Sequence, residues 1–243
     1  MKKRRPIRAG RPQPRRAPRS ANLEPSQDNM RALLERAGIQ LKPNQLDQLW
    51  RFHRLLRERN SDRDLTRLIE FETVVIKHYV DSLYVGKLLR LPSPLVDIGT
   101  GAGFPGIPLK IRYPELELTL AEMRPRRIAF LEEAIALLGL RKVKTFEHRV
   151  VSRSFTEPMA GVITRAVEPI SKTLLRTGGC TRAGSQLIFM KGPGAEEELQ
   201  QALKDFGRDY RVIRDQPYTL PHTPHERRLL VLERLHDPKP AEP

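Results

Sequence analysis

The chain has 243 residues, of which 39% are hydrophobic, enough for one large α/β domain with an extension or for two small domains. Its 44 lysines and arginines exceed its 29 acidic residues, and its formal net charge is +15. No apolar run approaches the ~18 residues of a membrane span, and we expect no signal peptide. The single cysteine, Cys180, excludes an internal disulfide and favours a reducing compartment, so we expect a cytoplasmic protein.

The positive charge is concentrated near the N-terminus. Residues 1–20 contain nine lysines and arginines, four prolines and no acid. Because this composition disfavours a helix and buries little apolar surface, we predict a disordered basic tail over residues 1–24. Two interpretations stay open, namely an arm that neutralises RNA phosphates and a solvated extension without a role.

Helix signals follow, and we expect residues 25–91 to form an N-terminal helical extension. A short capped helix ends at Gly38, and a second helix begins near Pro43. The polar stretch 58–64 predicts a loop. A third helix is expected over residues 70–89.

From residue 92 to the C-terminus we expect a second domain in which strands and helices alternate. This alternation predicts a mostly parallel sheet with helices on both faces. In chain order, the expected strands are 95–98, 117–121, 142–146, 161–165, 186–190, 210–218 and 227–235. No helix pattern separates the last two, so they should pair antiparallel. The expected fold class is α/β, the Rossmann-like seven-stranded sheet of class I methyltransferases that use S-adenosylmethionine.

The loop after the first strand carries the strongest chemical signal. Glycine suits a backbone that takes positive φ or lies against a ligand, so Gly99, Gly101 and Gly103 predict a cofactor cradle before a helix. Asp97 ends the first strand. Glu122 ends the second, about 20 residues beyond the loop, where an acid accepts the ribose hydroxyls of a nucleoside.

The same loop is also compatible with a dinucleotide site or with no ligand site at all. The spacing Gly101-x-Gly103-x-x-Gly106 also fits a dinucleotide fingerprint, and a plain strand-to-helix turn needs no ligand at all. However, the carboxylate of Asp97 would repel a pyrophosphate and attract a cation. S-adenosylmethionine carries a sulfonium and an ammonium group and has no phosphate. The loop together with Asp97 and Glu122 therefore favours this cofactor.

Four motifs point to one family. They are the stretch 96–108, which ends Phe-Pro-Gly-Ile-Pro, and the segments His78–Ser82, Thr164–Ala166 and Met190–Gly192. With these motifs the chain resembles, from about Met30 to Leu235, the RsmG (GidB) family of bacterial guanine-N7 methyltransferases of small-subunit (16S) ribosomal RNA.

The resemblance implies a cofactor, a partner and a set of binding residues. The cofactor is S-adenosyl-L-methionine, and the partner is ribosomal RNA or the small ribosomal subunit. The residues implied to bind the cofactor are Gly99, Phe104, Val150, Val151 and Arg165. We expect a monomer that contacts no membrane.

The chain also departs from the family pattern. The family usually has a glutamate two residues after the position of Arg149, where this chain has Val151. It usually has an acid before the fourth strand, where this chain has Ala160. Its usual Asn-Leu-Thr run is replaced here by Asp64-Leu65-Thr66. Two alternatives therefore stay open: a diverged RNA methyltransferase with another target, and a non-catalytic RNA-binding or ribosome-assembly protein that retains the fold.

The expected reaction needs no general base, because guanine N7 already carries a free lone pair. Arg165 and Lys191, at the ends of the fourth and fifth strands, are the candidate catalytic residues. We expect them to anchor phosphate, contact guanine O6 or position the cofactor, unless they are merely solvated cations. His222 and His225 are expected in a proline-bordered loop without a cysteine, so we predict no metal site.

Overall fold

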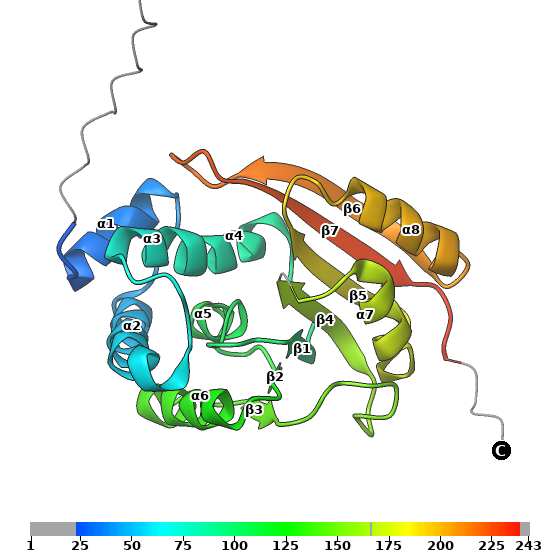
Figure 1. Cartoon of the computed structure of the whole chain (residues 1–243), viewed down its shortest axis with the longest axis horizontal. Helices are drawn as coiled ribbons and strands as arrows, with labels where there is room; N and C mark the ends of the chain where they lie inside the picture. The colour runs from blue at the N-terminus through cyan, green and yellow to red at the C-terminus, as the bar shows by residue number, and fades with distance from the viewer. Residues whose placement is uncertain (1–22, 166, 239–243) are drawn as a thin grey trace, which may run out of the picture.

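The alternation after residue 92 forms one seven-stranded sheet in the computed structural model, which describes residues 23–165 and 167–238 (Figure 1). The strands are β1 (Leu95–Ile98), β2 (Leu118–Ala121), β3 (Val143–Phe146), β4 (Met159–Arg165), β5 (Thr181–Lys191), β6 (Tyr210–Thr219) and β7 (Glu226–Arg234). Their spatial order is β3-β2-β1-β4-β5-β7-β6. Strands β1 to β5 are parallel, and β7 is antiparallel to both β5 and β6. The predicted fold class is confirmed. Apart from its last two residues, the predicted basic tail 1–24 lies outside the described residues.

The helices cover both faces of this sheet. They are α1 (Gln27–Arg36), α2 (Pro43–Arg63), α3 (Phe71–Val74), α4 (Asp81–Leu88), α5 (Gly106–Arg112), α6 (Pro125–Leu138), α7 (Ile170–Thr177) and α8 (Glu196–Phe206), with a π-helical turn η1 (Val75–Val80) and a 3₁₀ turn η2 (Gly178–Cys180). Successive strand side chains point to opposite faces. Leu95 and Ile188 therefore pack with α1, α2, α5 and α6, whereas Val96 and Leu187 pack with α7 and α8.

The second helix differs from its prediction at its C-terminal end. The sequence predicts a loop over residues 58–64, but α2 continues to Arg63, so this prediction is wrong. Arg59 and Arg63 both form ion pairs with Glu133 of α6, at 2.7 and 3.0 Å. These contacts with a helix 70 residues away in the chain stabilise the last turns of α2, and the local sequence gives no sign of them.

The predicted third helix is one helical segment from Phe71 to Leu88, but its middle is the π-turn η1. π-Helical turns are rare in proteins, and those that occur are often found at functional sites. This one buries Tyr79 in the core. It also carries His78 and leads directly into Asp81, the first residue of α4.

The helical extension and the sheet share one hydrophobic core. Phe52 of α2 contacts Phe104, which follows the glycine loop, and Phe130 of α6, with ring centroids 5.6 and 6.0 Å apart. Because aromatic rings at these separations attract one another and bury a large apolar area, the extension is held firmly against the glycine loop. This contact positions η1 beside the carboxyl ends of the strands.

Candidate functional site

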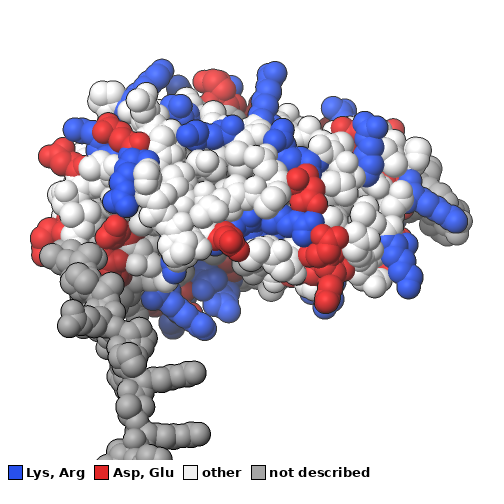
Figure 2. Space-filling model, turned by 90° about the horizontal axis from the view of Figure 1, so that it is seen from above, with Lys and Arg blue, Asp and Glu red and all other residues white. Residues whose placement is uncertain are grey.

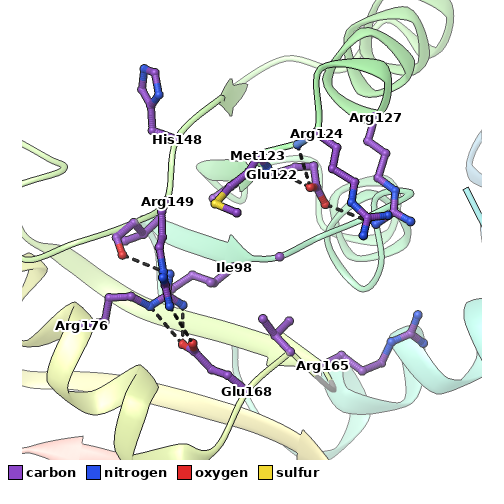
Figure 3. Close-up of a pocket in the computed structure, with 14 residues that line it drawn as sticks. Ile98, Glu122, Met123, Arg124, Arg127, His148, Arg149, Arg165, Glu168 and Arg176 are labelled. Carbon is purple, nitrogen blue, oxygen red and sulfur yellow. Dashed lines mark hydrogen bonds and ion pairs between the residues drawn. The ribbon is translucent and has the colours of Figure 1, made fainter. Parts of the chain in front are cut away.

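A cavity of about 570 Å³ lies at the carboxyl ends of β1, β2 and β4 (Figure 3). The chain order of the strands reverses between β1 and β4, and ligands of open α/β sheets bind at such a switch point. The cavity is lined by Gly99, Glu122, Val150 and Arg165, four of the predicted site residues. Its volume is in the range of small-molecule and cofactor sites.

The glycine loop has the backbone geometry that the sequence predicts. Gly99, Gly101 and Gly103 have φ values of +67°, +59° and +88°. A Cβ atom on Gly99 would lie only 2.6 Å from Cγ2 of Val167, a second residue of the cavity wall. Glycine is therefore required at position 99 both by the backbone conformation and by the close approach of Val167.

Asp97 is fully buried beneath the loop and does not line the cavity. Its Oδ2 accepts hydrogen bonds from the Thr100 hydroxyl at 2.6 Å and from the Gly106 N–H at 2.8 Å. Burial raises the pKa of the Asp97 carboxyl to about 6. In this structure the side chain braces the loop from below, and its Oδ1 has no hydrogen-bond partner. Its predicted contact with the cofactor stays a prediction.

Glu122 lines the cavity and holds the loop from the side of β2. Its Oε2 accepts a hydrogen bond from the Gly101 N–H at 3.1 Å, and its Oε1 accepts from the backbone N–H groups of Met123 and Arg124. Arg127 of α6 forms an ion pair with the same carboxylate at 3.7 Å. The carboxylate is thus fixed at the position where a nucleoside ribose binds in this kind of fold.

Phe104 is buried behind the loop and is not among the residues that line the cavity. The imidazole of His78 stacks on its ring with centroids 4.4 Å apart, and the guanidinium of Arg165 lies 5.5 Å from the ring centroid. Phe104 therefore supports both polar side chains. Its predicted cofactor contact is not tested by this packing.

Arg165 ends β4 in the cavity wall, but its guanidinium points toward the helical extension (Figure 3). It donates to the Lys77 carbonyl at 3.0 Å, to Asp81 Oδ2 at 3.2 Å and to His78 Nδ1 at 3.1 Å. Because Nδ1 accepts, the His78 proton is on Nε2, which donates to the Thr66 hydroxyl. Burial, and then the charge of Arg165, lower the pKa of His78 to about 3, so this imidazole is neutral.

Lys191, the second candidate catalytic residue, ends β5 outside the residues that line the cavity. Its ammonium group donates to the Glu168 carbonyl at 2.9 Å and to the Glu198 carboxylate at 2.7 Å. The side chain is thus held between α8 and the segment after β4. This places it as a support for the cavity wall.

The segment after β3 contributes Val150 but not Val151 to the cavity. The Val150 carbonyl accepts a hydrogen bond from Arg176 of α7 at 3.1 Å. Val151 is 48% exposed, and its N–H donates to the Ser154 hydroxyl at 2.8 Å. The side chain that replaces the family's usual glutamate therefore lies outside the cavity lining.

Five charged residues of the cavity wall are not among the predicted site residues, namely Arg124, Arg127, Arg149, Glu168 and Arg176. Arg149, Glu168 and Arg176 come from the segment after β3, the segment after β4 and helix α7, and their side chains meet at the carboxylate of Glu168 (Figure 3). In the sequence, Arg149 stands out only as the family's arginine two residues before Val151, and no local pattern marks Glu168 or Arg176. Their meeting depends on how α7 packs beside the β3–β4 connection.

Within residues 23–165 and 167–238, no group of three or more His, Cys, Asp or Glu side chains is placed to hold a metal ion. No helix in the same described ranges is long and apolar enough to cross a membrane.

The sheet order, with β7 antiparallel between β5 and β6, defines the class I methyltransferase fold. Two solved structures share the fold. A putative O-methyltransferase from Klebsiella pneumoniae aligns with a TM-score of 0.56 at 15% identity, over 86% of this chain and 99% of that one. A ribosomal protein L11 methylase from Lactobacillus delbrueckii subsp. bulgaricus aligns with a TM-score of 0.51 at 14% identity, over 70% and 81%.

Sequence comparison defines the family. The model of the GidB family, described as rRNA small subunit methyltransferase G, matches residues 45–225, and the chain belongs to this family. A "Ribosomal RNA small subunit methyltransferase G 2" of Syntrophobacter fumaroxidans is 51% identical over 218 residues, which are 90% of this chain and 44% of that protein. The chain thus spans less than half the length of this relative. A protein of the same name from Bdellovibrio bacteriovorus is 39% identical over 91% of this chain and 87% of its own length.

Proposed function

We propose that the protein transfers the methyl group of S-adenosylmethionine to N7 of a guanine in 16S ribosomal RNA of the small subunit. The observation that carries the proposal is the cavity at the switch point between β1 and β4, with the glycine loop on one side and Glu122 on the other. Membership of the rRNA small subunit methyltransferase G family supports the choice of substrate. The proposal places the protein in the cytoplasm, as a monomer that acts on rRNA or on the small subunit.

The residues present fit S-adenosylmethionine. Gly99 presents bare backbone to the cavity, Glu122 presents a fixed carboxylate, and Val150 adds a buried apolar wall. These residues, together with Arg165, would hold the cofactor. When bound, S-adenosylmethionine supplies an electrophilic methyl group on a sulfonium.

Neither His78 nor Asp97 is placed to act as a general base. Both nitrogens of His78 are engaged, one with Arg165 and the other with Thr66. Asp97 lies beneath the loop, outside the cavity lining. This arrangement suits attack by guanine N7, whose lone pair needs no activation. Catalysis then rests on alignment of the reacting atoms, an effect that contributes up to about 7–11 kcal/mol for well-oriented groups.

Arg165 and Lys191 act in this proposal by positioning. The guanidinium of Arg165 is directed to three acceptors of the helical extension, so it fixes the cavity wall beside the methyl acceptor. Lys191 is paired with Glu198, and its bond to the Glu168 carbonyl supports the segment that follows β4. A cation placed at N7 would oppose the reaction, because methylation leaves the guanine ring positively charged.

The departures from the family pattern leave the cavity intact. Val151 lies outside the lining, and Ala160 lies on β4 five residues before Arg165, toward the opposite end of the strand. These placements favour a catalytic protein over one that only binds RNA. A diverged RNA target is the second candidate, and it is favoured by Asp64, which replaces the family's usual asparagine and pairs with Arg124 near the cavity mouth.

The proposal is tested by incubating the purified protein with methyl-labelled S-adenosylmethionine and small subunits from cells that lack a methyltransferase of this family. We expect label in N7-methylguanosine of the rRNA. Cofactor binding without incorporation into any RNA would instead support the non-catalytic alternative. Label in a different RNA would support the diverged target.

A further inference from the structure

The cavity carries more positive charge than its cofactor explains. Five arginines and two glutamates line it. S-adenosylmethionine has a sulfonium, an ammonium and only one carboxylate, so it is itself a cation. A cavity built for the cofactor alone would be expected to balance its charge or to be acidic. The excess of arginines indicates that an anion also binds at this site.

Most of these arginines are already matched by an acid or by several acceptors. Arg165 has three acceptors from the helical extension. Arg127 pairs with Glu122 and donates to the Asp64 carbonyl at 2.8 Å. Arg124 is exposed, but the carboxylate of Asp64 lies 3.6 Å from it.

Arg176 and Glu168 form a hydrogen-bonded, largely buried ion pair. The Glu168 Oε1 accepts from Nε of Arg176 at 3.0 Å, from a second guanidinium nitrogen of the same residue and from the Thr173 hydroxyl at 3.0 Å. Both side chains are nearly buried, with 12% and 11% of their surface exposed. Two nitrogens of Arg176 donate to one oxygen of Glu168, and these charge-assisted hydrogen bonds offset the negative charge of Glu168.

Arg149 shares its nearest acid, Glu168, with Arg176, which is paired with that acid more closely. Its guanidinium lies 3.6 Å from the free oxygen of Glu168, too far for a hydrogen bond, and its side chain is 60% exposed. Figure 3 shows it reaching toward Glu168 from the chain just before Val150. Its donors are thus held beside the cofactor wall while they remain open to solvent.

We propose that Arg149 binds a phosphate of the RNA substrate, in the backbone next to the target nucleotide. The planar guanidinium offers paired N–H donors that match phosphate oxygens. On the face shown in Figure 2, basic and acidic side chains alternate instead of forming one broad basic patch. This inference rests on the proposed function, because it takes RNA as the occupant.

The test compares Arg149→Gln with a matched control, Arg141→Gln. Arg141 is also exposed but lies just before β3, at the opposite end of the sheet from the cavity. Binding to 16S rRNA is measured across a range of salt concentrations with S-adenosylhomocysteine present, and cofactor affinity is measured by calorimetry. We expect Arg149→Gln to weaken RNA binding about threefold to tenfold and to reduce the slope of log affinity against log salt by about one. Arg149→Lys should keep the slope and recover part of the affinity.

The control variant should retain the wild-type salt slope, and both variants should bind the cofactor as wild type does. An unchanged salt slope in Arg149→Gln, or a loss confined to cofactor affinity, overturns the assignment of Arg149. Wild-type methylation of the same RNA is measured in parallel. If wild type does not methylate the RNA but Arg149→Gln reduces the salt slope, the result contradicts the proposed function alone. If wild type methylates the RNA but Arg149→Gln leaves the salt slope unchanged, the result contradicts only the role of Arg149.

Discussion

The guanidinium of Arg165 and the carboxylate of Asp81 form an ion pair with a nitrogen–oxygen distance of 3.2 Å, which joins the cavity wall to the helical extension. The Asp81 side chain is only 3% exposed, and its other oxygen accepts from Arg227 of β7 at 3.1 Å. One buried carboxylate therefore holds arginines from two strands. Because Asp81 follows directly after η1, the π-turn determines where Arg165 is held.

Replacing Asp81 by Asn should weaken both the fold and the cofactor site. The variant leaves two arginines without their common carboxylate, and hydrogen bonds to charged groups contribute about 1.5–3 kcal/mol each. We expect the free energy of unfolding in urea to fall by about 2 kcal/mol and the affinity for S-adenosylmethionine to fall as well. Asp28→Asn is the control, because Asp28 is exposed and its pair with Arg31 contributes little. Equal stability of the two variants would contradict the role given to Asp81.

Gly99→Ala should abolish most of the cofactor affinity. Its new methyl group would meet Val167 at 2.6 Å in a backbone of φ +67°, so either the loop or the cavity wall must move. Gly139→Ala is a matched control, since Gly139 has φ +60° and open space around its Cβ position. Both variants should lose about 1 kcal/mol of stability from the strained backbone. Calorimetry that finds wild-type cofactor affinity in Gly99→Ala would show that the loop is not the cradle.

Asp97→Asn should change how stability depends on pH. Burial raises the pKa of Asp97 from 3.8 to about 6, so the folded state binds its proton more tightly than the unfolded state does. The stabilisation is present below about pH 4 and is lost as pH rises through 6, a change of about 2–3 kcal/mol. We expect the variant to lack this loss. Urea denaturation between pH 4 and 7 measures it, and parallel pH profiles for the two proteins would contradict the raised pKa of this buried carboxyl.

Deleting residues 1–20 should weaken RNA binding without affecting the cofactor. The deletion removes nine cations and no acid. Each cation that contacts a phosphate contributes to the dependence of RNA affinity on salt. We therefore expect lower RNA affinity and a smaller salt slope, with unchanged affinity for S-adenosylmethionine. An unaltered slope would show that this arm takes no part in binding.

The sheet and the loop were predictable because their signals are local. Short apolar runs mark the strands. Glycine adopts positive φ without steric cost, so Gly99, Gly101 and Gly103 by themselves indicate the loop conformation that the structure has. Glu122 was predictable too, since its place after β2 follows from its distance from the loop. Its hydrogen bond to Gly101 confirms that the two features meet.

The missed features depend on contacts between distant segments. The last turns of α2 are polar in sequence and are stabilised by Glu133, which belongs to another helix. Glu168 and Arg176 are ordinary surface types until α7 packs against the β3–β4 connection. Phe104 and Lys191 show the converse. The family resemblance predicts a cofactor contact for Phe104, and the end of β5 makes Lys191 a candidate catalytic residue. Packing against His78 and pairing with Glu198 set their actual positions.

The measurement that tests the central claim most directly is a map of N7-methylguanosine in 16S rRNA from cells with and without this gene. The account predicts one guanine whose N7 methylation disappears without the gene and returns when wild-type protein is supplied. It also predicts that the Gly99→Ala variant fails to restore the modification although it accumulates as a folded protein. An identical methylation map in both strains would contradict the account.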